Sequence, residues 1–334
     1  MLRLLHGTSY DFIRYWKHAV IITVVFIAAG FTRLAIHRGF NYNIEFTGGT
    51  FLQVTFASAP GIESVRSAVE GAGFHGAEVT QFGSPTEYGI RAQSLNASAA
   101  DTATIDQTAS RIEAALHSAF GDTSHVKVAR GEFVGPRVGQ ELKQKATTAI
   151  LLSFLVTLIY LAIRFEWRFG VAAVAATAHD VLTTLAFLAM MHLEVSLTVV
   201  AAILTVIGYS LNDTIIIFDR VRENLKKQRK EPLRDVLNRS INETLPRSVL
   251  THATALMATL ALLVFAGEII RPFSWVMAFG IFTGTFSSIY VAGALLLWIE
   301  HRWPRPTTTD QRGPTRQGSG GKATRARPAE AVAQ

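Results

Sequence analysis

The chain consists of long apolar runs interrupted by one long segment of shorter, mixed elements. Six runs are long enough, or nearly so, to cross about 30 Å of hydrocarbon, which takes roughly 20 helical residues. This pattern predicts a polytopic α-helical membrane protein with six transmembrane helices. The spans lie at about 17–36, 146–164, 170–190, 195–218, 249–267 and 274–299.

The segment 37–145, between the first two spans, changes to short elements and predicts one extracytoplasmic α+β domain. Their order, β-α-β-β-α-β, is the split βαβ pattern of ferredoxin-like folds. Strands are expected at 50–57, 76–83, 87–94 and 125–135, and helices at 61–73 and 101–121. Its histidines are scattered, so we expect no metal site among His75, His117 and His125.

Composition agrees with a membrane protein and excludes several kinds of chemistry. The chain is 49% hydrophobic and only 17% charged, whereas a soluble domain carries about 25% charged residues. It has no cysteine, which excludes disulfides, thiol chemistry and cysteine-based metal sites. Because no nucleophile–base set or phosphate-binding loop is found, we expect no enzyme.

Basic residues predict the orientation. The stretch 219–248 carries nine Lys or Arg and the tail after Glu300 carries seven, whereas the short loops 191–194 and 268–273 carry only Arg271. Under the positive-inside rule both termini are cytoplasmic, with a cytoplasmic N-terminus at 1–16 and a basic loop at 219–248. The first span is then an uncleaved anchor.

The tail 300–334 is basic and rich in Pro, Thr, Gly and Ser, which predicts disorder. Such a tail is attracted to anionic lipid or RNA, or it serves only as a topology signal and solubilising segment. We expect membrane lipids as its partners and no nucleic acid.

Two carboxylates fall inside the spans, where a charge costs about 2.5–3.5 kcal/mol at a helix centre. Asp180 is near the middle of the third span, and Asp213 is near the cytoplasmic end of the fourth. Arg247 on an antiparallel neighbouring helix is the expected partner of Asp213, because Arg220 is roughly 10 Å further along the same helix. A static Asp213–Arg247 pair that fixes helix packing explains the pattern equally well.

Each of the other polar positions has a simpler interpretation. Asp180 could form an interhelical hydrogen bond through a protonated carboxyl, and Asp219 with Arg220 could mark the membrane surface. Polar residues that could hold water surround Asp213 on its own helix and follow Arg247 on the neighbouring helix: Ser210, Asn212, Thr214, Thr251, His252 and Thr254. Small residues in the last span permit close packing, internally or with a second subunit; they are Gly280, Gly284, Ser287, Ser288 and Gly293.

Five motifs in this order resemble the SecF family, the smaller membrane subunit of the SecD–SecF complex of bacterial Sec translocation. They are IEFTGGT (44–50), FVGPRVGQEL (133–142), AHDV (178–181), IGYSLNDTIIIFDRVREN (207–224) and NETLPRSVLTHAT (242–254). The resemblance covers about residues 10–300. It implies half of an RND-type transporter, with SecD supplying the other half.

The resemblance also implies partners and an energy source. SecF-like proteins work in the cytoplasmic (inner) membrane with SecD and the SecYEG channel, with YajC and YidC as further candidates. They are thought to use the proton-motive force, without a cofactor, on an unfolded secretory polypeptide. Asp213 and Arg247 match the charges assigned to proton transport in this family. Asp180 is a weaker match, and Arg220 and Asn212 are secondary candidates.

One motif departs from the family pattern where the first span meets the external domain. The family usually has Asp before FTGGT, whereas this chain has Glu45, which keeps the charge and changes the reach. Gly48 and Gly49 are expected to form a tight backbone turn there.

These observations lead to one hypothesis and two alternatives. A proton that reaches Asp213 from outside weakens its pairing with Arg247, changes the packing at the SecD interface and swings the external domain. The first alternative is an RND-like exporter of small molecules or lipids, although such pumps carry about twice as many spans. The second is a non-transducing scaffold of the translocon.

Overall fold

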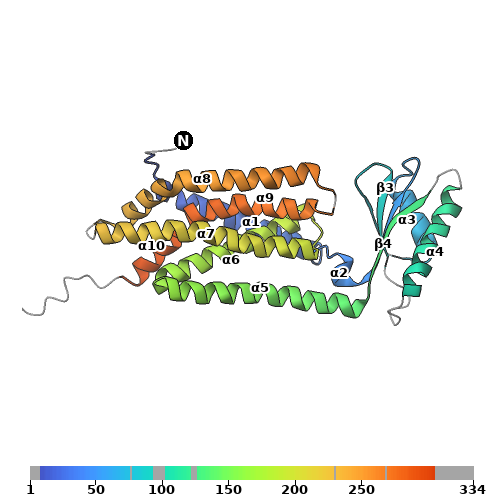
Figure 1. The fold of residues 1–334 in the computed structure, drawn as a ribbon, viewed down its shortest axis with the longest axis horizontal. Coiled ribbons are helices and arrows are strands. Elements are labelled where there is room, and N and C mark those ends of the chain that lie inside the picture. The colour runs from blue at the N-terminus through green and yellow to red at the C-terminus, as the bar shows by residue number, and fades with distance from the viewer. Residues whose placement is uncertain are drawn as a thin grey trace, which may run out of the picture.

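The chain folds into a helical bundle with a small α+β domain at one end (Figure 1). The computed structural model describes residues 8–75, 77–92, 102–121, 126–228, 231–267 and 269–304. Most of the predicted tail therefore lies outside the described residues. In this part of the chain, six helices are long and apolar enough to cross a membrane.

The α+β domain has the predicted element order, with bounds close to those expected. A short helix α2 (Ile44–Thr47) leads into β1 (Gly49–Thr55), α3 (Ile62–Gly71), β2 (Glu78–Gln81), β3 (Glu87–Ala92), α4 (Thr102–Phe120) and β4 (Lys127–Val134). The sheet order is β2-β3-β1-β4, and all neighbouring strands are antiparallel. This is the split βαβ arrangement.

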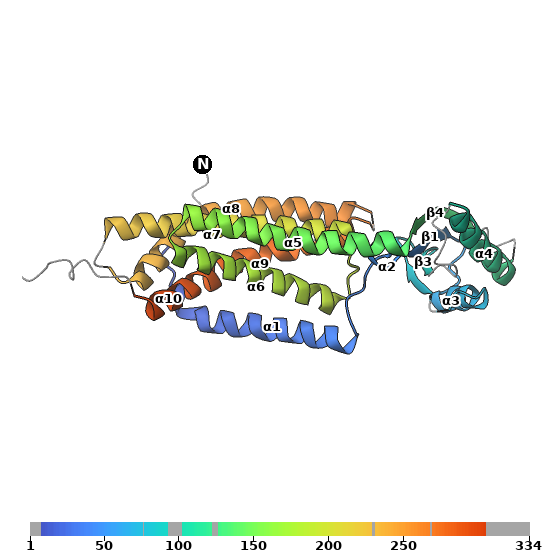
Figure 2. The same ribbon diagram turned by 90° about the horizontal axis from the view of Figure 1, so that it is seen from below.

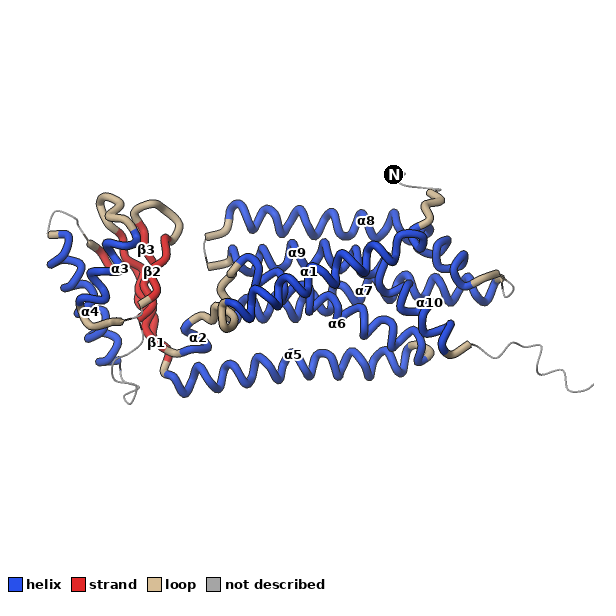
Figure 3. Tube along the Cα trace, turned by 180° about the vertical axis from the view of Figure 1, so that it is seen from behind, coloured by secondary structure: helices blue, strands red, loops and turns tan. Residues whose placement is uncertain are grey.

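The sheet has two different faces because side chains alternate along each strand. Leu52 and Val54 of β1 and Ile90 of β3 are fully buried and pack against Val65 of α3 and Ile112 of α4. Both helices cover the sheet face that points away from the bundle (Figure 3). The residues between these positions, such as Arg91, therefore lie on the face toward the bundle.

The membrane bundle is built from long helices that lie before and after the α+β domain in the chain. The chain runs from η1 (Phe12–Tyr15) and α1 (Trp16–Ile36), through the α+β domain, to α5 (Pro136–Arg164), α6 (Trp167–Met191), α7 (Leu197–Lys227), α8 (Leu233–Phe265) and α9 (Arg271–Ser287). It then passes through a π-helical turn, η3 (Ser288–Ala292), into α10 (Gly293–Arg302).

The membrane helices form an inner and an outer group. In α6, α7 and the last span, α9 to α10, 56%, 56% and 67% of the apolar stretch is buried. In α1, α5 and α8 the buried share is only 11%, 6% and 17%. Figure 2 shows α1 along one edge of the bundle. The outer helices therefore present their apolar faces to lipid or to another chain.

Several helices continue beyond the predicted spans. Helix α5 begins at Pro136, before the expected start at about 146, α7 continues to Lys227, and α8 already begins at Leu233. The predicted loop 219–248 is therefore largely helical. Hydropathy identifies only the part of a helix that crosses hydrocarbon. Helical turns made of polar residues beyond that part have no apolar run by which to predict them.

Gly48 and Gly49 form the predicted turn between α2 and β1. Their φ angles are 73° and 125°, which L side chains rarely adopt. A Cβ on Gly48 would lie 2.8 Å from Cα of Pro136 at the start of α5. At this turn the chain that enters the α+β domain, at Gly48, therefore packs directly against the chain that leaves it, at Pro136.

We expect Gly48→Ala to destabilise the protein by about 1–3 kcal/mol, since it combines backbone strain with a backbone clash. Thermal unfolding of the purified protein in detergent measures the effect as a lowered midpoint. Gly135→Ala is the matched control, because a Cβ there would meet nothing within 4 Å. Equal midpoints for the two variants would contradict this account of the turn.

Candidate functional site: carboxylates inside the helical bundle

Asp180 joins three helices at the centre of the bundle. Its side chain is fully buried on α6, and its Oδ2 accepts hydrogen bonds from Ser210 of α7 and from Ser287 of α9 (2.7 Å for the latter). Its Oδ1 lies 3.1 Å from Nδ1 of the neighbouring His179. Both oxygens of this carboxylate therefore have partners.

Asp213 lies on α7, about one helical turn after Ser210, and its carboxylate is held differently from that of Asp180. Its side chain is 4% exposed, and Oδ1 accepts a hydrogen bond of 2.5 Å from Ser248 of α8. Its Oδ2 is buried and has no hydrogen-bond partner among the described residues. A buried carboxylate oxygen without a donor is costly unless it takes up a proton.

His252 completes the surroundings of Asp213. It follows Ser248 by one turn of α8, is buried, and packs edge-on against the ring of Tyr209 at a centroid distance of 5.3 Å. Its Nδ1 lies 2.5 Å from the carbonyl oxygen of Ser248. Because a carbonyl only accepts, this nitrogen carries the hydrogen.

The spacing of α7 places its buried polar residues near one another. Ser210, Asp213 and Thr214 are three and four residues apart and therefore share one face of the helix. Ser210 contacts Asp180, and the hydroxyl of Thr214 lies 2.9 Å from that of Ser288. The polar groups thus form a chain of contacts across α6, α7 and α9.

Small residues bring α9 close enough for these contacts. A Cβ on Gly280 would lie 2.2 Å from Val206, and one on Gly284 would lie 3.0 Å from Ser210. The π-helical turn begins at Ser288, beside the contact with Thr214. Such turns occur frequently at functional sites.

The structure differs from the predicted pairing of Asp213 with Arg247. Ser248 donates to the carboxylate, whereas Arg247 is exposed and attracts the carboxylate electrostatically without a direct ion pair. Consecutive residues of a helix point about 100° apart, so only one of the two can face α7. Asn212, also predicted as a secondary candidate, is exposed next to Asp213.

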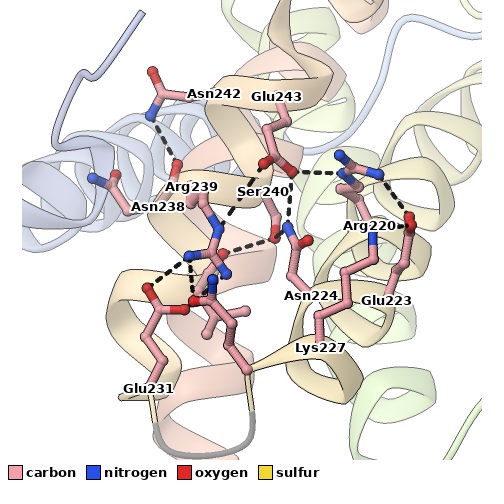
Figure 4. Close-up of polar contacts among 12 residues, drawn as sticks. Arg220, Glu223, Asn224, Lys227, Glu231, Asn238, Arg239, Ser240, Asn242 and Glu243 are labelled. Carbon is pink, nitrogen blue, oxygen red and sulfur yellow. Dashed lines mark hydrogen bonds and ion pairs between the residues drawn. The ribbon is translucent and has the colours of Figure 1, made fainter. Parts of the chain in front are cut away.

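Arg220 belongs to a separate polar cluster at the far end of α7 and α8 (Figure 4). It donates to Glu243 of α8 at 2.6 Å and to Glu223 at 2.7 Å. Asn224, which is buried, donates to the same Glu243 and to Ser240. The interpretation of Arg220 as a residue outside the hydrocarbon agrees with these acidic partners.

Glu45 has a role that the sequence did not indicate. Its Oε2 accepts a hydrogen bond of 2.6 Å from the backbone N–H of Leu197, the first residue of α7. An acceptor at this position satisfies one of the free N–H groups of a helix N-terminus and interacts favourably with the helix dipole. Glu45 therefore joins the start of the α+β domain to the helix that carries Asp213.

Sequence reasoning missed Ser248 as the donor to Asp213. The spacing of Ser248 and His252, one turn apart and facing the apolar core, could have indicated it.

The described residues contain no group of three or more His, Asp or Glu side chains that could hold a metal ion.

We expect Asp180→Ala to lower stability by about 1–3 kcal/mol, because the hydroxyls of Ser210 and Ser287 lose their buried acceptor. Asp180→Asn keeps an acceptor oxygen and should cost less. The midpoint of thermal unfolding in detergent separates the two variants. Thr205→Ala, at an exposed position of α7, is the control, and a loss as large as that of Asp180→Ala would contradict the role of the hydrogen bonds.

The chain resembles known proteins over most of its length. The family model "Protein export membrane protein SecD/SecF, C-terminal" matches residues 113–302. A protein translocase subunit SecF of Gemmatimonas aurantiaca is 58% identical over 306 residues, 91% of each chain. A subunit with the same name from Vibrio alginolyticus is 40% identical over 88% of this chain and 92% of that protein.

Solved structures give the same result for the fold. The chain matches the crystal structure of SecDF, a translocon-associated membrane protein from Thermus thermophilus, with a TM-score of 0.80 at 35% identity. The match covers 90% of this chain and 40% of that one. A structure of SecDF in a super-membrane-facing form matches with a TM-score of 0.64, also at 35% identity. The chain therefore belongs to the SecD/SecF family of protein-export membrane proteins and, within it, to the SecF subunits.

Proposed function

We propose that this SecF-type chain, together with SecD, uses the proton-motive force to promote late steps of protein export across the cytoplasmic membrane. Asp213 binds the proton. The observation that carries the proposal is the buried Oδ2 of Asp213, which has no donor among the described residues, inside a helix that crosses the membrane. A proton would remove the charge that is costly at this buried position.

The two carboxylates support different roles. Asp180 has partners on both oxygens and ties α6 to α7 and α9. Protonating it would remove an acceptor from these contacts, so its role is to hold the helices together. Asp213 has one satisfied oxygen and one available oxygen, which fits reversible proton binding.

A polar strip on the outside of the bundle supports SecD as the partner. Asn212 of α7 and Arg247, Thr251 and Thr254 of α8 are exposed although they lie within helices long enough to cross the membrane. Polar and charged groups facing lipid are costly and usually face another helix or water. A second membrane subunit on this face would cover Arg247 and place it in a shared interface.

Helix α7 supplies a physical connection between proton binding and the α+β domain. Asp213 follows the N-terminus of α7 by sixteen positions, or roughly 24 Å at about 1.5 Å per residue. At that N-terminus the N–H of Leu197 donates to Glu45 of α2, the short helix that leads into β1. A change in packing around Asp213 can therefore be transmitted along α7 to the α+β domain.

The energy available is large enough for such a movement. One charge crossing 100 mV releases about 2.3 kcal/mol, so a few protons suffice to drive a domain motion.

The charge distribution supports the proposed orientation, with both termini in the cytoplasm of the inner-membrane complex. The first described residues pack on α8 far from the α+β domain: the backbone N–H of Tyr10 donates to Asn242, and Asp11 pairs with Arg234. This end carries the basic residues of α7 and α8. SecYEG, YajC, YidC, lipids and the unfolded secretory polypeptide are proposed partners on the basis of family membership.

Two other functions remain open to experiment. An RND-like exporter of small molecules or lipids would need the second half-transporter to form a pathway for them. A non-transducing scaffold would use the same interfaces without the proton. The unsatisfied oxygen of Asp213 favours proton-driven transduction, because a static scaffold gains no stability from a buried carboxylate oxygen without a donor. In all three cases the chain acts without an enzymatic reaction of its own.

We expect Asp213→Asn, made in the complex with SecD, to remove the dependence of export on the proton gradient. Since one proton crossing 100 mV contributes about 2.3 kcal/mol and about 1.4 kcal/mol is a factor of ten, the gradient-dependent rate should fall about tenfold or more. Export of a secretory protein into membrane vesicles, with and without a protonophore, measures the effect.

Asp219→Asn is the matched control for this experiment. Its carboxylate is on the same helix but is half-exposed and paired with Arg164 at 2.9 Å. It should leave the response to the protonophore unchanged. The proposal fails if Asp213→Asn exports as fast as the wild type and stays equally sensitive to collapse of the gradient.

A further inference from the structure

A side-chain ion pair connects the α+β domain to the bundle. Arg91 lies on the bundle-facing side of β3, since its neighbour Ile90 points into the domain core. Its guanidinium pairs with Glu194 in the loop between α6 and α7, and also with Glu78 of β2 at 2.8 Å. The side chains of Arg91 and Glu194 are only 13% and 26% exposed. Partial burial strengthens such a pair relative to one on the surface.

The same loop is also held by backbone contacts to the chain that enters the domain. The N–H of Val195 donates to the carbonyl of Asn41 at 2.7 Å, and the N–H of Asn43 donates to the carbonyl of Val195 at 2.9 Å. These bonds do not depend on protonation. The Arg91–Glu194 pair differs from them, because its attraction requires a charged carboxylate.

A cleft of about 170 Å³ lies beside this pair, between the sheet and the bundle. Its polar lining comes from both sides and includes Asn43, Glu45, Arg130, Glu132, Glu194 and Ser196. The cleft is large enough to hold water. Protons on this side of the membrane can therefore reach Glu194.

We propose that the Arg91–Glu194 ion pair is a releasable clasp. It holds the α+β domain against the bundle while Glu194 is charged, and it opens when Glu194 takes up a proton from the extracytoplasmic side. Arg91 and Glu194 are thus positioning residues, since they act through the placement of the domain. The direction of release rests on the proposed function, in which the cleft faces the acidic side of the membrane.

The surroundings of Glu194 favour proton uptake. Burial raises the pKa of Glu194 above its ordinary value, and this effect outweighs the opposing attraction of Arg91. The carboxylates of Glu78 and Glu45 raise the pKa of Glu194 further. A group with a raised pKa loses its charge at a higher pH than an exposed glutamate. The pair therefore weakens as the pH falls through the raised pKa of Glu194.

Other charged groups in the cleft and the loop have partners of their own. Arg130 and Glu132 of β4 pair with each other. The ring of His192, in the same loop as Glu194, lies 5.6 Å from the ring of His37 at the end of α1. His192→Gln separates any contribution of this histidine pair from that of Glu194.

The pH dependence of the domain position tests the release directly. Spin labels at Ala114→Cys on α4 and Phe265→Cys at the end of α8 report the distance between domain and bundle, since both sites are exposed. The chain has no native cysteine, so labelling is specific. Lowering the pH from about 8 to about 5, across the range of perturbed carboxyl groups, should broaden and lengthen the distance distribution.

Glu194→Gln should give the broad, long distribution at every pH, and His192→Gln should behave as the wild type. A distribution that does not change with pH in the wild type, or that changes equally in Glu194→Gln, would overturn the clasp. This measurement needs no proton gradient. It therefore judges the clasp even if Asp213→Asn shows that the proposed proton coupling is wrong.

Cross-linking tests whether the clasp must open during export. A short reducible bis-methanethiosulfonate reagent would join Arg91→Cys to Glu194→Cys in the complex with SecD. The control joins Arg91→Cys to Glu78→Cys, its cross-strand partner within the domain. Locking the first pair should abolish stimulation of export and reductant should restore it, whereas the control pair should stay active. Full activity of the locked first pair would show that release is not required.

Discussion

A carboxylate placed inside hydrocarbon must be hydrogen-bonded, paired with a cation or protonated, because an isolated charge there is too costly to keep. This constraint decides how the bundle is built around Asp180 and Asp213. Asp180 satisfies it completely through two serines and a histidine, and it thereby sets the distances among α6, α7 and α9. Asp213 satisfies it on only one oxygen, so its environment is complete only with a further donor or a proton.

The helix that carries Asp213 also connects the membrane bundle to the α+β domain. Its buried face packs against α9 through Gly280 and Gly284, and its N-terminus is capped by Glu45. The loop before α7 contributes Glu194 to the contact with β3. The domain is therefore attached to the N-terminal end of the helix whose packing proton binding would change. The exposed polar strip around Arg247 is the surface on which SecD would pack in the proposed complex, close to the helix that carries Asp213.

The sequence predicted most of the fold, because each element carries a strong local pattern. Long apolar runs marked the six membrane helices, and alternating positions with turn residues marked the strands of the α+β domain. Helix ends such as Lys227 and Leu233 were missed, because polar turns continue a helix without an apolar pattern. The cost of a membrane charge singled out Asp180 and Asp213, and both are buried in the bundle. Their partners did not follow from that cost, because choosing between Arg247 and Ser248 requires the rotation of α8, which packing decides.

In the proposed mechanism Asp213, rather than Asp180, takes up the proton. Difference infrared spectroscopy of the purified complex with SecD tests it most directly, since a protonated carboxyl group has its own carbonyl stretching band. We predict that acidification produces such a band in the wild type and in Asp180→Asn, and that the band is lost in Asp213→Asn. A band that persists unchanged in Asp213→Asn would contradict the account.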